Sequence, residues 1–171
     1  MTVWAEHLST CEAPACFGAM QERESSSVFI VGCVVVAATT GALIAMGRRL
    51  GSAGFPFASI GGILFRSSGF AIDSRSLVGG LLLHIVFAFL WSILAERLAR
   101  TIGRGSAAVL TATTQFIVSW IVAWWSGSGL ASALALGDRI VYAVVLAGAL
   151  VVGMRFAFSL TRNTSSHVGA M

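Results

Sequence analysis

Four long apolar stretches, separated by short polar segments, dominate the sequence. The uncharged runs cover residues 25–47, 76–95, 105–137 and 140–154, and the last continues past Arg155 to Leu160. A helix needs about 20 mainly apolar residues to cross the roughly 30 Å hydrocarbon core of a bilayer, and each run can supply them. In lipid every backbone polar group needs a partner within the protein, so even the valine-rich first run is expected to be helical. The pattern predicts transmembrane helices at about 28–46, 77–94, 107–125 and 140–160.

The predicted fold is an all-α polytopic membrane protein with its four transmembrane helices in an up-and-down bundle. Short connections before the third and fourth helices favour antiparallel neighbours. The longer connection at 47–76 contains an apolar patch, residues 55–65, interrupted by Pro56, Gly61 and Gly62. This patch is too short to span the bilayer, so it predicts a re-entrant or interfacial segment. A loop folded over the mouth of the bundle is the alternative.

Composition supports a single membrane domain. The chain has 171 residues, of which 57% are hydrophobic and 11% charged, whereas about a quarter of the residues in soluble domains are charged. We expect a polar, mostly disordered N-terminal tail at 1–27, the four-helix domain at 28–160 and a short C-terminal tail at 161–171. The first tail lacks the features of a secretory signal peptide. Translation from Met20, which opens an ordinary polar leader, is an alternative start.

The eleven basic residues are all arginine, and they flank the apolar runs. In this position arginines contact lipid headgroups, whereas nucleic-acid binding would need a basic cluster interleaved with exposed aromatics. The expected headgroup anchors are Arg48, Arg49, Arg97, Arg100 and Arg104, together with Trp120, Trp124 and Trp125 at the end of the third helix. Arg97, Arg100 and Arg104 favour an orientation with both termini in the cytoplasm. Arg48 and Arg49 favour the opposite orientation. The lipid bilayer is the first predicted partner.

His84 is the ionisable residue deep inside the second run. Ser76, Gly80, Ala88 and Ser92 lie on the same helix face, because they follow at steps of four. Small residues let a neighbouring helix approach, so we expect His84 to point into the bundle.

A neutral imidazole offers one donor and one acceptor. The predicted partners are polar residues of the third helix, namely Gln115 together with Thr111, Thr114 or Ser119. A structural role in this helix interface is favoured. A cofactor-binding or proton-linked role for His84 is the alternative, because ionisable groups within spans are functional candidates. His7 and His167 lie in the tails, which disfavours bis-histidine haem ligation within one chain. The cofactor, if there is one, is unknown.

Catalytic and metal-binding patterns are absent from the sequence. There is no HExxH, paired-carboxylate or CxxC spacing, so we predict no catalytic residue, no metal site and no enzymatic activity. Cys11 and Cys16 form no recognisable site, and Cys33 is expected to be a small buried residue. Gly61, Gly62, Gly79 and Gly80 are expected at bends or close helix contacts.

A row of small residues in the first helix comprises Ala37, Gly41 and Ala45. Such rows let helices pack closely, either between chains or within one bundle, and both explanations remain open. Contact with other membrane subunits or with further copies of the chain is therefore expected.

Short motifs link the chain to a loose group of proteins. They are the segment from Met46 to Gly51, Phe55-Pro56-Phe57, Gly80 with His84, and residues 138–148. In these parts, over about residues 28–158, the chain resembles uncharacterised bacterial inner-membrane proteins of four helices. The resemblance implies the architecture, the inner membrane and an early histidine in the second helix, but no activity. Where that group often has a second histidine, this chain has Asp138-Arg139.

Three functional hypotheses follow. A structural or accessory subunit of a larger membrane complex is favoured, because small residues lie on several helix faces and catalytic groups are lacking. The second is a small homo-oligomeric transporter or channel with His84 and Gln115 along a polar path. The third is a pigment-binding or haem-binding protein that uses His84.

Overall fold

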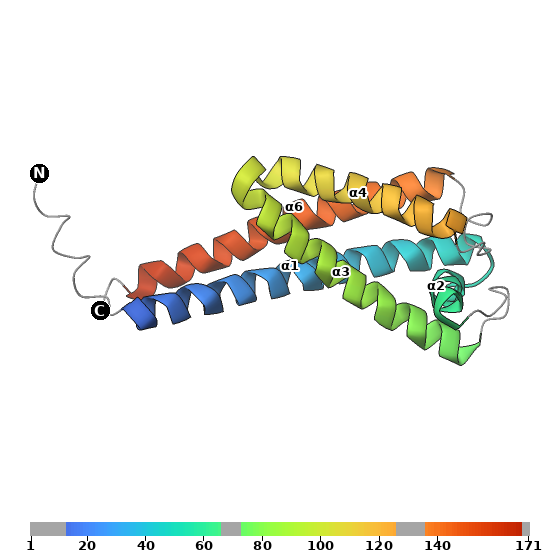
Figure 1. Ribbon diagram of the computed structural model, residues 1–171, viewed down its shortest axis with the longest axis horizontal. Helices are drawn as coiled ribbons and strands as arrows, with labels where there is room; N and C mark the ends of the chain where they lie inside the picture. The colour runs from blue at the N-terminus through green and yellow to red at the C-terminus, as the bar shows by residue number, and fades with distance from the viewer. Residues whose placement is uncertain (1–12, 66–72, 126–135, 169–171) are drawn as a thin grey trace, which may run out of the picture.

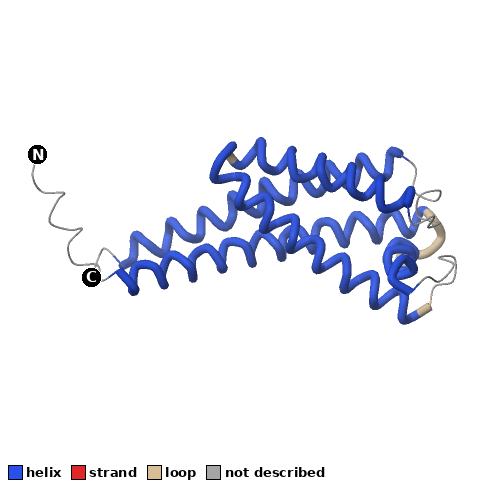
Figure 2. Tube along the Cα trace, viewed as in Figure 1, coloured by secondary structure: helices blue, strands red, loops and turns tan. Residues whose placement is uncertain are grey.

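The computed structural model describes residues 13–65, 73–125 and 136–168, and these parts of the chain are almost entirely helical (Figures 1 and 2). Its elements are α1 (Ala13–Arg49), α2 (Phe55–Phe65), α3 (Ser74–Ile102), α4 (Arg104–Trp125) and α6 (Leu136–Val168). The described residues contain no strand. The all-α prediction is confirmed.

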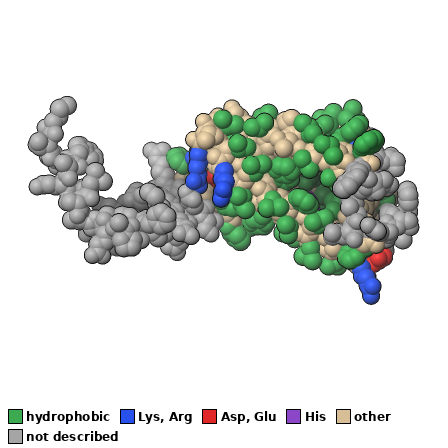
Figure 3. Space-filling model, viewed as in Figure 1, with side chains coloured by type: hydrophobic (Ala, Val, Ile, Leu, Met, Phe, Trp, Pro, Cys, Tyr) green, Lys and Arg blue, Asp and Glu red, His purple; other side chains and the backbone are tan. Residues whose placement is uncertain are grey.

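Four of the helices that the structure describes are long and apolar enough to cross a membrane. The candidate spans are Ser26–Arg49, Ser74–Ile102, Arg104–Val122 and Leu136–Leu160. Successive spans run in opposite directions (Figure 1), and large apolar side chains cover the surface between their ends (Figure 3). In water this surface would be costly to expose, whereas lipid tails solvate it. The protein is therefore a multi-pass membrane protein with an up-and-down arrangement of four spans.

The outer ends of α1 and α6 are longer than expected. We predicted a disordered tail up to residue 27, but α1 begins at Ala13. Residues 13–24 contain good helix formers, and Pro14 falls in the first turn, where a missing N–H is tolerated. Extending an existing helix also avoids the cost of nucleating a new one. For the same reason α6 continues through the predicted C-terminal tail to Val168. Residues 1–12, including His7 and Cys11, lie outside the described residues.

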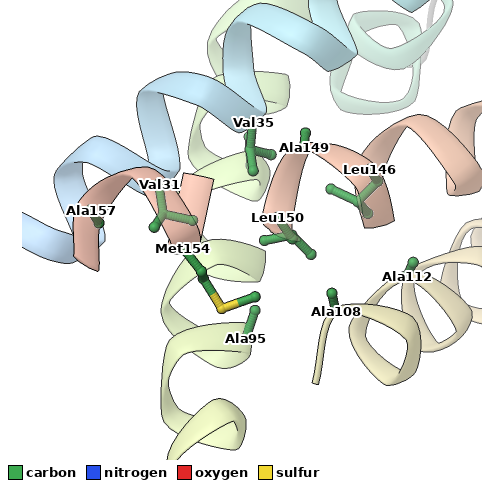
Figure 4. Packing of buried hydrophobic residues seen from close by; sticks show 11 residues of the cluster. Val31, Val35, Ala95, Ala108, Ala112, Leu146, Ala149, Leu150, Met154 and Ala157 are labelled. Carbon is green, nitrogen blue, oxygen red and sulfur yellow. The ribbon is translucent and has the colours of Figure 1, made fainter. Parts of the chain in front are cut away.

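The main apolar core lies between α6 and the other three spans. Leu146, Leu150 and Met154 of α6 are almost fully buried. Figure 4 shows Leu150 and Met154 pointing toward Ala95 of α3 and Ala108 of α4. Large side chains on one helix fill the space that alanines leave on its neighbours, which lets the backbones pack closely.

The second helix, α2, is the short apolar segment predicted between the first two spans, and it packs against α3. A Cβ atom on Gly61 would overlap the carbonyl oxygen of Ser76, and one on Gly80 would overlap that of Phe57. Each would also lie 2.8 Å from the other glycine's backbone nitrogen. The two backbones are therefore in direct contact, as small residues permit. The predicted close-packing role is confirmed for Gly61 and Gly80.

The spans α3 and α4 form a hairpin that opens away from its turn. Only Gly103 separates them, with a φ of 82° that suits glycine. From this turn α3 runs obliquely and diverges from α4, and α2 lies at its far end (Figure 1). At that end Asp73 caps α3 by accepting a hydrogen bond from the backbone N–H of Arg75. This divergence determines which helices surround His84.

Candidate functional site: a polar junction at His84

His84 lies where four helices meet. Its side chain is buried in α3 with 5% of its surface exposed, as the predicted four-step row requires. Its Nε2 atom is 3.1 Å from Thr39 Oγ1 of α1. The imidazole ring also contacts Phe57 of α2 and Tyr142 of α6, with ring centroids 5.8 Å and 6.5 Å away in edge-to-face geometry. We call these four residues the His84 junction.

The bonds of Thr39 define the protonation of the histidine. The Thr39 hydroxyl donates to the carbonyl oxygen of Val35 at 2.7 Å. Because a hydroxyl carries one proton, its oxygen can then only accept from the imidazole. The geometry thus favours a proton on Nε2 of His84. Tyr142 of α6 contacts the histidine through its ring. Thr39 therefore connects the polar side chain of His84 on α3 to the backbone of α1.

Chemically, this arrangement suits a structural connection between helices. The junction satisfies a polar group that would be costly to leave unpaired in lipid. Nε2 is occupied by Thr39, and the rings of Phe57 and Tyr142 contact the imidazole. Among the described residues, no group of three or more His, Cys, Asp or Glu side chains is placed to hold a metal ion.

The partner of His84 lies on α1, whereas the sequence had suggested the third span. Thr111 of α4 is fully buried, and its Oγ1 has no hydrogen-bond partner among the residues that the structure describes. Ser119 donates to the carbonyl of Phe116 on its own helix. Gln115 is half-buried, and no hydrogen bond joins it to His84 within the described residues. The physical reason is the divergence of α3 from α4, which brings α1, α2 and α6 around the histidine instead.

Sequence reasoning missed Thr39, Phe57 and Tyr142. Two signals were present: a threonine pair in the middle of the first apolar run, and the single tyrosine of the chain in the fourth. A polar atom inside a span needs a partner, so Thr39 and Tyr142 were candidates to pair with His84. Whether Thr39 and Tyr142 face His84 at the same depth in the membrane depends on how α1 packs against α6. This packing cannot be derived from the sequence of either helix alone.

An ion pair joins α1 to α6 at the end of the bundle nearer to α2. Arg49 Nη1 of α1 is 2.9 Å from Asp138 Oδ1 in the first turn of α6. The aspartate side chain is 10% exposed and the arginine 73%. Arg49, expected to contact lipid headgroups, therefore also links two spans, while Arg48 beside it is exposed.

The other expected headgroup anchors lie at the ends of the spans. Arg97, Arg100 and Arg104 are exposed, and the Arg104 guanidinium lies 4.2 Å from the centroid of the Phe158 ring. Trp120 and Trp124 are exposed near the other end of α4. The side chain of Trp125 lies outside the part that the structure describes. The positions suit headgroup contact.

No protein-family model matches the chain, and no curated protein or solved structure is significantly similar to it. The resemblance to four-helix bacterial inner-membrane proteins therefore stays a prediction. Function is inferred from the geometry of the chain.

A small-residue face covers the outer side of α1. Ala37, Gly41 and Ala45 are exposed, so none of the other described helices packs on this row. Cys33, which precedes Ala37 by four residues, is also exposed and carries a free thiol. We expected Cys33 to be buried, and that expectation was wrong because the face to which it belongs points outward. We call Cys33, Ala37, Gly41 and Ala45 the α1 small-residue face. The side chain of Cys16 lies outside the described part of the chain.

Proposed function

We propose that the protein is a non-catalytic structural or accessory subunit that docks onto other membrane helices through the α1 small-residue face. The exposure of this face carries the proposal. Its four residues follow at steps of four, so they form one continuous strip on the helix. A Cβ atom on Gly41 would meet no atom within 4 Å. The strip is open along the part of α1 that spans the membrane.

The contrast with other lipid-facing surfaces supports a protein partner. On α6 the exposed Gly148 lies four residues after Val144 and four before Val152, on the same helix face. These two valines are 65% and 59% exposed. These bulky side chains suit contact with lipid tails. In a membrane, helices associate through close packing because lipid is as apolar as the side chains, and small residues permit that packing. The bare strip on α1 fits a second helix better than it fits lipid.

The His84 junction supports a non-catalytic role. Its side chains connect α1, α3 and α6 through a hydrogen bond from His84 to Thr39 and a ring contact from His84 to Tyr142. A fixed internal scaffold of this kind holds α1 in place and presents its outer face at a constant angle. We propose that the junction serves this purpose in place of ligand binding.

The proposed location is a bacterial inner membrane with both termini in the cytoplasm. Arg97, Arg100 and Arg104 are exposed at the end of the bundle from which α1 starts and toward which α6 returns (Figure 1). Arginines in short loops remain preferentially on the cytoplasmic side. Alkaline phosphatase fused to the C-terminus should therefore be inactive, and an active fusion would reverse the orientation.

Native size after mild extraction tests the proposed function. The wild-type protein from its own membrane should migrate with a larger complex that contains other proteins. Gly41→Leu should release the protein from this complex, because the leucine side chain prevents a partner helix from packing on the α1 small-residue face. Gly148→Leu is the matched control, since it places the same side chain on a lipid-facing surface that is already bulky. Migration of the wild-type protein only as a free small protein or a small homo-oligomer would refute the proposal.

A further inference from the structure

We infer, on the basis of the proposed function, that the partner is a membrane helix with an aspartate or glutamate that pairs with Arg48. This arginine lies three residues after Ala45 and seven after Gly41 on α1, and it is exposed. Residues at these spacings share a side of a helix, so Arg48 is in line with the α1 small-residue face. The face therefore ends in a positive charge.

The turn after α1 leaves Arg48 on the outer side of the helix. α1 ends at Arg49, and the chain then turns toward α2. The backbone N–H of Ser52 donates to the carbonyl oxygen of Gly47 at 2.9 Å, so the connection folds back against the last turn of α1. Gly47 is buried beneath this connection, whereas Arg48 remains exposed. The guanidinium is therefore accessible to a helix that packs on the face.

The neighbouring Arg49 shows the same arrangement inside the bundle. It pairs with Asp138 of α6 at 2.9 Å, at the end of the contact between α1 and α6. Successive residues of a helix differ in direction by about 100°, so Arg48 faces a different side of α1. The two arginines thus end two sides of α1, and the inner one already has a carboxylate from a neighbouring span. We assign the same kind of pair to the outer one.

The described part of the chain leaves Arg48 without a carboxylate. At this end of the bundle Asp138 is bound to Arg49, and Asp73 caps α3. Glu24, the glutamate of α1 nearest in sequence, lies 24 residues before Arg48 on the same helix. At 1.5 Å per residue the two are about 36 Å apart, which is beyond the reach of the side chains. A carboxylate for Arg48 therefore has to come from the partner.

Docking itself makes an opposite charge necessary. A helix that packs on Ala45 lies within one turn of Arg48 and covers the aliphatic part of its side chain. It also displaces water and lipid headgroups from one side of the guanidinium. A charge that loses solvent is costly unless it gains a hydrogen-bonded opposite charge. A carboxylate matches the planar guanidinium through two parallel hydrogen bonds, so it is the group that we assign to the partner.

Carbodiimide coupling in the protein's own membrane tests this pair directly. The reagent joins an amine to a carboxylate without a spacer, so it couples only groups in contact. All basic residues of the chain are arginine, so Arg48→Lys introduces its only side-chain amine. This variant should form an adduct with an aspartate or glutamate of a different membrane protein, identified by peptide mass spectrometry. Arg75→Lys, exposed at the same end on α3, is the matched control and should form none.

Native size after mild extraction separates this pair from the docking of the face. Arg48→Glu should lower the fraction recovered in the larger complex about fivefold, because two negative charges then meet. Arg75→Glu makes the same change away from the face and should leave that fraction unaltered. If Gly41→Leu releases the protein but Arg48→Glu does not, the proposed function stands and the charge pair is refuted. A wild-type protein that migrates alone refutes the docking itself.

Three coupling results would overturn the assignment of a partner carboxylate. The first is the absence of a protein adduct from Arg48→Lys when this variant still migrates with the larger complex. The second is an equal yield of protein adducts from Arg48→Lys and Arg75→Lys. The third is an adduct of Arg48→Lys with lipid alone or with a second copy of the chain, which would assign the arginine to a headgroup or to self-association.

Discussion

Thr39 of α1 and His84 of α3 are joined by a 3.1 Å hydrogen bond within the membrane-spanning part of the bundle. Thr39 is completely buried and donates a hydrogen bond to the carbonyl oxygen of Val35 on its own helix, while the ring of Tyr142 of α6 contacts the imidazole. Side chains from three spans thus meet at the histidine. In the hydrocarbon region such a cluster is stable only if its members satisfy one another.

Replacing Thr39 should loosen this connection. Thr39→Val keeps the shape of the side chain but removes the acceptor of the His84 N–H, so the free energy of unfolding should fall by about 1 kcal/mol. Denaturation of the purified protein in mixed micelles measures the change. Thr39→Ser retains the hydroxyl and is the control. A Thr39→Val variant as stable as the wild type would show that the bond contributes nothing.

The contact between α2 and α3 should be intolerant of a single methyl group. Gly80→Ala forces a Cβ atom onto the backbone of Phe57, which cannot move without displacing α2. We expect a loss of stability of about 2 kcal/mol from this overpacking. Gly79→Ala is the matched control, because the atoms nearest to its Cβ would be those of the Phe65 ring, which is half-exposed and can rotate. Equal losses in the two variants, measured by the same denaturation, would contradict the close backbone contact.

The Arg49–Asp138 ion pair should contribute modestly. Arg49 is 73% exposed, so solvent screens the charge attraction despite the 2.9 Å separation. A double-mutant cycle with Arg49→Gln and Asp138→Asn should give a coupling energy below about 1 kcal/mol, and added salt should reduce it further. A coupling of several kcal/mol, unaffected by salt, would mean that the pair is shielded from solvent.

The sequence predicted the spans well because membrane insertion leaves a local signal. An apolar run such as 76–95 is sufficient to indicate a helix of the right length, and the four-step row around His84 indicates its buried side. The partner of His84 was not predictable in this way. It depends on the opening of the α3–α4 hairpin, at whose open end Gly61 and Gly80 let α2 pack closely against α3.

The ends of α1 and α6 show another limit of sequence reasoning. The polar composition of the two ends suggested tails outside the helices. Composition alone does not show that extending a helix that is already formed costs little free energy. The exposure of Cys33 was missed for a different reason. A uniformly apolar helix such as α1 gives no periodic signal for its outer side.

His84 should not hold a pigment or haem if it serves as a connection between helices. The protein purified from its own membrane should then show no absorption band in the visible region. His84→Ala should lower stability in the same way as Thr39→Val and change no visible absorption. A visible band in the wild-type protein that disappears in His84→Ala would assign the histidine to a cofactor.

Site-specific photo-cross-linking in native membranes tests the central claim most directly. A photoreactive residue at Ala37, on the α1 small-residue face, is compared with one at Gly148 on the lipid-facing side of α6. The proposed accessory role predicts a protein adduct with a different membrane protein from position 37 and none from position 148. Absence of any protein adduct at position 37, or an adduct there only with a second copy of this chain, would contradict it.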